Sequence, residues 1–110
     1  GMTGALTPPK LTIVVAQLTQ AVGDLAANAA AMQAVRARHP SADLILYPEL
    51  QLIGYPPEDL VLKPALATRA AEELAKLAAA TSDGGPAMLV GSVERDADGK
   101  LYNIVALLDG

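Results

Sequence analysis

Glu49 is the side chain in this 110-residue sequence whose position best suits chemistry. It follows the apolar run 43–47, and Pro48 between them ends any strand ladder because proline has no backbone N–H. Glu49 is therefore expected at the carboxyl end of a strand, where ligand sites form in open α/β sheets. Apolar neighbours such as Leu50 could partly desolvate the carboxylate, which would raise its pKa and suit a general base. The alternative is a solvated loop glutamate or a cap for the next turn.

Nucleophiles are scarce around this candidate base. The sequence contains no cysteine, so it can form no disulfide and offers no thiolate metal ligand. It also lacks the strongest side-chain nucleophile, because that is the cysteine thiolate. Its single histidine, His39, has no clustered Asp or Cys, so we expect no metal site and no serine-histidine triad. Gly84, Gly85 and Pro86 lack the Lys-Ser/Thr of a P-loop and indicate a turn.

Composition and charge exclude several classes of function. The chain is 52% hydrophobic, which is typical of a core-forming domain rather than a disordered segment. Its net charge is −4 and it has no Lys/Arg cluster, so we expect no nucleic-acid partner. No apolar run has the length of a membrane span, and the N-terminus lacks the order of a signal peptide. We therefore expect a cytoplasmic protein without a membrane partner.

The elements that must position Glu49 begin with a strand and a helix. Residues 11–17 are β-branched and continuous, which predicts a strand buried on both faces. Asp24 is in N-cap position before a long Ala-rich segment, and His39-Pro40 ends that helix. Arg36 and Arg38 fall in its last turn, where positive charge suits the helix dipole. One face of this helix is expected to carry the residues that recur at helical spacing, namely Leu25, Asn28, Met32 and Val35.

A second strand and a second helix follow. Residues 43–47 form the strand, and strand, helix and strand in this order predict a βαβ unit with parallel strands. Residues 51–57 hold Gly and Pro and indicate a loop. The next helix is predicted from Pro64 to about Ala80, with a turn cluster at 81–86. Its apolar stripe comprises Leu66, Leu74 and Leu77.

Two further strands complete the pattern. Residues 88–93 and 101–108 are apolar runs, and Asp98-Gly99 between them is a hairpin signal typical of a type I′ turn. The order is βαβαββ, an α/β class. Residues 1–10, which begin with Gly1 before Met2, are interpreted as a tag remnant and a flexible leader.

The residues around Glu49 resemble a known family. Tyr47-Pro48-Glu49-Leu50, followed by Gly54-Tyr55-Pro56-Pro57-Glu58-Asp59-Leu60, resembles the first catalytic block of the carbon–nitrogen hydrolase (nitrilase) superfamily. The second stretch is similar in particular to the glutaminase domain of glutamine-dependent NAD⁺ synthetases. Further segments that agree in order and spacing are Val15-Ala16-Gln17, Val22-Gly23-Asp24 with Asn28, Val90-Gly91-Ser92, and Tyr102-Asn103 ahead of Asp109-Gly110.

The resemblance implies a Glu-Lys-Cys triad in which Glu49 is the general base. The cysteine thiolate would attack the side-chain amide of glutamine, and the lysine would stabilise the developing oxyanion. Tyr55 follows Gly54 in the loop next to Glu49, so its hydroxyl could line the substrate pocket or the ammonia exit; the alternative is packing against the domain surface with the hydroxyl in water. Released ammonia would pass to a separate synthetase domain that uses ATP to amidate deamido-NAD⁺. No cofactor is expected in this segment itself.

The resemblance also implies the fold and its state. Residues 11–110 would form the N-terminal half of a nitrilase-like α-β-β-α sandwich, ending before the family's Lys and Cys. Two helices would cover one face of a mixed sheet and leave the other face apolar and open. We therefore expect a segment that is inactive alone and forms a homo-oligomer. The alternatives are a fragment of another amidase in the superfamily, or a non-catalytic half-domain that acts in assembly.

Overall fold

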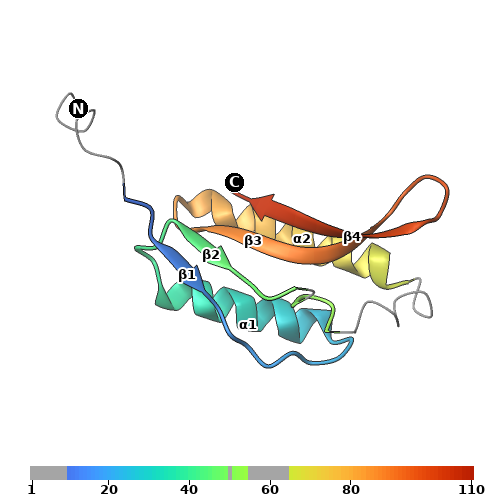
Figure 1. Cartoon of the computed structure of the whole chain (residues 1–110), viewed down its shortest axis with the longest axis horizontal. Coiled ribbons are helices and arrows are strands. Elements are labelled where there is room, and N and C mark those ends of the chain that lie inside the picture. The colour runs from blue at the N-terminus through green and yellow to red at the C-terminus, as the bar shows by residue number, and fades with distance from the viewer. Residues whose placement is uncertain (1–9, 50, 55–64) are drawn as a thin grey trace.

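Strands and helices alternate along the chain in the predicted order. The computed structural model describes residues 10–49, 51–54 and 65–110, and Figure 1 shows their arrangement. The predicted leader, residues 1–9 in particular, and the predicted start of the second helix lie outside these ranges. The elements are β1 (Ile13–Val15), α1 (Leu25–Arg38), β2 (Leu44–Leu46), α2 (Leu66–Ala80), the 3₁₀ turn η3 (Thr81–Asp83), β3 (Ala87–Arg95) and β4 (Leu101–Leu108). The βαβαββ pattern is confirmed.

The four strands form one mixed sheet in the order β1-β2-β3-β4. β1 pairs parallel with β2, and β2 pairs parallel with β3. β4 runs antiparallel to β3 along its whole length. This is the parallel βαβ unit followed by a hairpin that the sequence predicts.

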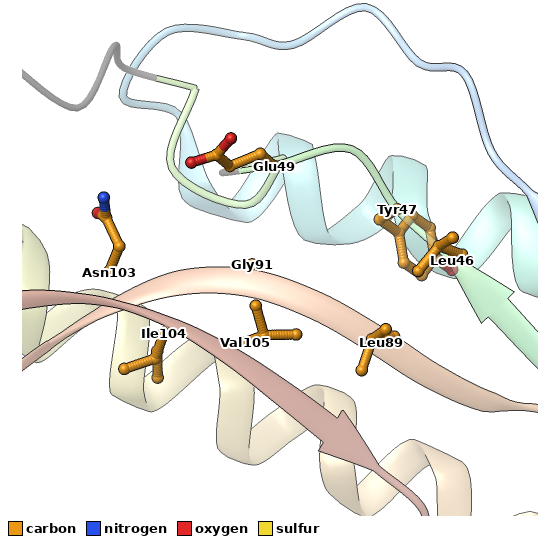
Figure 2. A pocket seen from close by; sticks show the side chains of 8 residues that line it. All are labelled: Leu46, Tyr47, Glu49, Leu89, Gly91, Asn103, Ile104 and Val105. Carbon is orange, nitrogen blue, oxygen red and sulfur yellow. The ribbon is translucent and has the colours of Figure 1, made fainter.

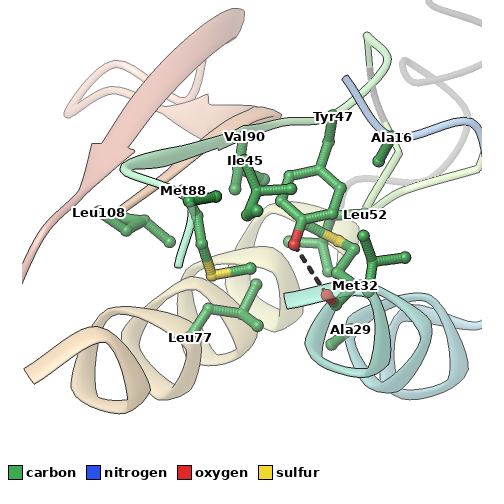
Figure 3. Close-up of a cluster of buried hydrophobic side chains, with 12 residues drawn as sticks. Ala16, Ala29, Met32, Ile45, Tyr47, Leu52, Leu77, Met88, Val90 and Leu108 are labelled. Carbon is green, nitrogen blue, oxygen red and sulfur yellow. Dashed lines mark hydrogen bonds between the residues drawn. The ribbon is translucent and has the colours of Figure 1, made fainter. Parts of the chain in front are cut away.

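Both helices pack on the same face of the sheet (Figure 1). Asp24 caps α1 as predicted, because its carboxylate accepts a hydrogen bond of 3.1 Å from the Ala27 N–H. The helix faces meet the sheet in a continuous aliphatic core, shown in Figure 3. Buried members of that core are Ala16, Ala29, Met32, Val35, Ala42, Ile45, Tyr47, Leu52, Leu77, Met88, Val90 and Leu108.

The other face of the sheet is apolar and uncovered. Along β1, Val14 packs against the core, whereas Ile13 and Val15 are 47% and 65% exposed. Val105 and Leu107 on β4 are 72% and 64% exposed. The predicted burial of the first strand on both faces is therefore wrong, because helices cover one side only. The open apolar face that the resemblance implied is present.

Arg36 lies in the last turn of α1 as predicted, and its side chain also forms a long-range ion pair. Its side chain is only 7% exposed and forms a two-pronged ion pair with Asp83, with distances of 2.6 Å and 2.9 Å. Its Nε also donates to the Pro86 carbonyl at 2.8 Å. The pair therefore ties the end of α1 to the connection between α2 and β3.

The hairpin between β3 and β4 uses a longer turn than the predicted two-residue type I′ turn. The Asp96 N–H donates to the Lys100 carbonyl at 2.9 Å, and the Gly99 N–H donates to the Asp96 carbonyl at 3.0 Å. The loop thus holds three residues and ends at Gly99, whose φ is +81°. The Asp96 carboxylate selects this turn by accepting from the N–H groups of Asp98 and Lys100.

Candidate active site

Glu49 lies at the carboxyl end of β2, as the sequence predicts. β2 ends at Leu46, the Tyr47 N–H still donates to the Leu89 carbonyl of β3 at 3.2 Å, and Glu49 follows beyond the end of the strand (Figure 2). Glu49 is exposed, so the described residues do not provide the partial desolvation of its carboxylate that the sequence predicts. The reason is that the sheet is open on this side, and no described element packs over the carboxylate.

Beside Glu49 the open face is hollowed by a cavity of about 330 Å³ (Figure 2). Strand β2 contributes to one side and the β3–β4 hairpin to the other. Its lining residues are Leu46, Tyr47, Glu49, Leu89, Gly91, Asn103, Ile104 and Val105. A mostly apolar cavity with a few polar side chains is the usual form of a small-molecule site.

Asn103 is the second polar side chain of this cavity, and sequence analysis assigns it no role beyond its place in a Tyr-Asn pair. It lies on β4 two residues before Val105, so the two share a face of the strand. Val105 belongs to the open face, and the amide of Asn103 therefore stands beside the same hollow as the Glu49 carboxylate (Figure 2). Side chains along a β-strand alternate between the two faces of the sheet, and this alternation is the sequence signal that could place Asn103 on the open face.

Tyr47 borders the cavity, but its ring enters the core on the helix side (Figure 3). Its hydroxyl donates a hydrogen bond of 2.7 Å to the Met32 carbonyl of α1. Burial raises the pKa of this phenol well above its ordinary value, and the nearby Arg36 charge only partly opposes that rise. Tyr47 is therefore a neutral structural donor that fixes the end of β2 on α1.

The other candidate residues are placed as follows. Tyr55 lies outside the described residues, so the role of Tyr55 stays a prediction. Leu50 and the rest of the Gly-Tyr-Pro-Pro-Glu-Asp-Leu stretch after Gly54 also lie outside them. His39 is the C-cap of α1. Lys100 is exposed in the hairpin, with its Nζ 5.7 Å from the centre of the Tyr102 ring, which fits a solvated charge rather than a catalytic lysine.

Metal-binding clusters and membrane-spanning helices are both absent from the described part of the chain. No group of three or more His, Cys, Asp or Glu side chains is arranged there to hold a metal ion. None of its helices is long and apolar enough to cross a membrane.

Residues 12–110 match the sequence profile of the carbon–nitrogen hydrolases. The chain belongs to the carbon–nitrogen hydrolase family. Among relatives of this family, it is 41% identical over 106 residues to the glutamine-dependent NAD(+) synthetase of Synechocystis, covering 89% of this chain and 19% of that protein. It is 45% identical over 105 residues to the glutamine-dependent NAD(+) synthetase of Rhodobacter capsulatus, covering 92% and 18%. The chain thus spans about a fifth of the length of these curated relatives.

Solved carbon–nitrogen hydrolase structures share the fold. The glutamine-dependent NAD⁺ synthetase of Acinetobacter baumannii superposes with a TM-score of 0.74 at 36% identity, over 90% of this chain and 19% of that one. An amidase from Nesterenkonia superposes with a TM-score of 0.78 at 23% identity, over 90% and 38%, which supports the fold alone. The α/β arrangement with a mixed four-stranded sheet is therefore that of the family's N-terminal part.

Proposed function

We propose that this chain is part of a glutaminase domain that releases ammonia from glutamine for NAD⁺ synthesis. The observation that carries the proposal is Glu49, a carboxylate at the carboxyl end of a parallel strand beside a cavity on the open face. The similarity to glutamine-dependent NAD(+) synthetases supports the choice of glutamine over other amides.

In this proposal Glu49 is the general base. It takes the proton from a cysteine thiol, the thiolate attacks the side-chain amide carbon of glutamine, and a lysine stabilises the oxyanion. The amide nitrogen leaves as ammonia with that proton, and water then cleaves the thioester to give glutamate. The 110 residues hold no cysteine, so a partner segment must supply the nucleophile and the chain alone is inactive.

The ammonia is consumed at a second active site. A synthetase domain there binds ATP and deamido-NAD⁺ and joins ammonia to the activated carboxylate, so the whole protein is an amidotransferase and a ligase. The segment described here needs no cofactor for its own step. Because these substrates are intracellular metabolites, we place the protein in the cytoplasm. Tyr55, close to Glu49 in the sequence, is proposed to line the glutamine pocket or the ammonia exit.

A chimera tests the proposal. Residues 12–110 replace the matched segment of the Synechocystis synthetase, and ammonia release from glutamine is measured. The chimera is expected to hydrolyse glutamine, and Glu49→Gln is expected to lower kcat by at least about 100-fold, the usual contribution of a general base. Glu72→Gln, the same change at an exposed position of α2, is the matched control and keeps full activity.

Two outcomes would overturn the proposal. A Glu49→Gln chimera with unchanged kcat removes Glu49 as the base. A chimera that hydrolyses other small amides but not glutamine favours another amidase of the superfamily instead. Ammonia release from glutamine by the 110-residue chain alone would contradict its predicted inactivity.

A further inference from the structure

Asn28 is a buried amide whose hydrogen bonds join two loops. The side chain, in the first turns of α1, is only 2% exposed. Its Oδ1 accepts from the Ala21 N–H at 2.8 Å, and its Nδ2 donates to the carbonyls of Ala21 at 2.8 Å and of Leu52 at 2.9 Å. Ala21 lies in the loop before α1, and Leu52 lies three residues after Glu49. One side chain therefore satisfies backbone groups of both loops at once.

The two loops are also in direct contact. The Gly23 N–H donates to the Ile53 carbonyl at 3.1 Å. Gly54 lies so close to the first loop that a Cβ there would be 2.5 Å from the Ala21 carbonyl oxygen. The end of the Glu49 loop, at Gly54, therefore packs against the backbone of Ala21. The carbonyl of Ala21 is the same group that accepts a hydrogen bond from Asn28.

Glu49 depends on this anchoring because its own side chain is exposed. Among the described residues, Glu49 is held through its backbone carbonyl, which accepts a hydrogen bond from Gln20 Nε2 at 3.4 Å. Gln20 belongs to the same loop that Asn28 fixes. The position of the carboxylate is therefore tied to the backbone of residues 48–49 and 51–54, and that backbone contacts the loop before α1.

We infer that Asn28 is a positioning residue for Glu49. It acts through Leu52 and Ala21 and does not touch the substrate. This inference rests on the proposed role of Glu49 for its catalytic consequence, whereas the anchoring itself stands on the contacts alone. A misplacement of a catalytic group by about 1 Å can cost about 100-fold in rate, so loss of the anchor is expected to act on kcat.

Amide hydrogen exchange on the 110-residue chain tests the anchoring. Asn28→Asp keeps the shape and the acceptor but removes both donors, leaving the carbonyls of Ala21 and Leu52 facing a carboxylate. The N–H groups of Gln51 and Gly23, bonded within and to the Glu49 loop, are expected to exchange at least about tenfold faster. The Ala16 N–H, bonded to the Leu46 carbonyl inside the sheet, reports global opening and is expected to change less.

Controls keep the test decisive. Gln33→Glu makes the same amide-to-acid change on a half-buried position of α1 and is expected to leave the loop amides unchanged. If Asn28→Asp does not fold, Asn28→Ala removes the three bonds without burying a charge, with Gln33→Ala as its control. Equal acceleration of the Gln51, Gly23 and Ala16 amides would show a general stability effect and overturn the inference.

The chimera separates this inference from the proposed function. Asn28→Ala in the chimera is expected to lower kcat for glutamine at least about tenfold while KM stays within about twofold, because the base moves and the substrate contacts do not. A loss confined to KM would overturn the positioning role. If the unsubstituted chimera releases no ammonia, the proposed function fails, and the exchange pattern still decides whether Asn28 anchors the loop.

Discussion

Buried polar side chains in this molecule fall into two kinds. Asn28 and Tyr47 have well-formed hydrogen bonds to backbone groups. Gln51 and Ser92 are fully buried, yet neither the Gln51 amide atoms nor the Ser92 hydroxyl has a hydrogen-bond partner within the described residues. Leaving such a group without a partner costs about 1–3 kcal/mol. The two kinds therefore respond in opposite directions to apolar replacement.

Gln51→Met is expected to stabilise the chain by about 1 kcal/mol or more, because Met fills a similar volume without an unpaired amide. Urea unfolding followed by circular dichroism measures the change. Gln33→Met, on the half-buried side of α1, is the control and is expected to stay within about 0.5 kcal/mol. A loss of stability in Gln51→Met would show that the amide has a partner after all.

The ion pair between Arg36 and Asp83 predicts a pH dependence. The hydrogen bond from Arg36, aided by the Gly85 N–H, holds the pKa of the Asp83 carboxyl well below its usual range. A pKa lowered by folding contributes stability above the unfolded value of about 3.9 and loses it as the pH falls further. Asp83→Asn is therefore expected to have a lower urea midpoint than the unsubstituted chain between pH 5 and pH 7, with the difference shrinking below about pH 4.

Asp109→Asn makes the same change of charge at an exposed aspartate, and this control is expected to keep the urea midpoint of the unsubstituted chain at pH 7. A difference between Asp83→Asn and the unsubstituted chain that stays constant down to about pH 2 would contradict the assignment.

At the scale of elements, two connecting loops depend on glycine for different reasons. Gly54 and Gly99 have nearly the same backbone φ angle, +78° and +81°. At Gly99 an added Cβ would meet only the flexible end of Arg95 at 3.7 Å, whereas at Gly54 it would meet a backbone carbonyl oxygen at 2.5 Å. Conformational strain is common to both positions, and the steric clash exists only at Gly54.

Substitution by alanine separates the two effects. Gly99→Ala is expected to cost about 1–2 kcal/mol, the penalty of a left-handed backbone for an L-residue. Gly54→Ala is expected to cost at least about 2 kcal/mol more, because the Glu49 loop must move away from Ala21. Urea unfolding of both variants gives the difference directly, and equal losses would show that the two loops are not in tight contact.

Local signals predicted the elements well. Asp24, the proline after His39 and the Gly99 hairpin each act on their nearest neighbours, so the sequence places the ends of α1 and the β3–β4 pair correctly. The place of Arg36 in the last turn of α1 is predicted correctly, but its ion pair is not predictable from local sequence because the partner Asp83 is 47 residues away. The turn before Gly99 was misjudged because the carboxylate of Asp96, not the Asp-Gly pair alone, organises it.

The candidate site divides in the same way. Glu49 could be placed at a strand end from its neighbours, but its exposure depends on what covers the sheet. The shared cavity with Asn103 depends on the pairing of β3 with β4, which brings together residues 54 positions apart. The role of Asn28 depends on contact between two loops, and helical spacing presents it only as one member of a buried stripe.

At the scale of the whole molecule, the uncovered apolar face dominates. Exposed side chains of β1 and β4 lie at its two margins, with partly buried residues of β2 and β3 between them. An apolar face of this kind drives association in water. We therefore propose that the 110-residue chain pairs with a second copy through this face.

Light scattering coupled to size-exclusion chromatography measures this association. The unsubstituted chain is expected to elute as a dimer or larger species, and Ile13→Lys with Leu107→Lys is expected to shift it toward the monomer, because both changes place charge on the open face. Ala34→Lys, an exposed position of α1 on the opposite side, is the control and is expected to leave the mass unchanged. A monomer at high concentration before any substitution would contradict the expectation.

The spatial order of the strands, β1-β2-β3-β4, is also their order along the chain. Each of the last three strands therefore pairs with the strand made before it, and no strand is inserted later between two existing neighbours. The parallel pairs join residues far apart in the sequence, Ile13 with Leu44 and Leu44 with Ala87, so each of these pairings requires the helix between its two strands to be made first. The β3–β4 hairpin, which borders the cavity beside Glu49, can therefore pair only after β2 and the residues that follow it have been synthesised.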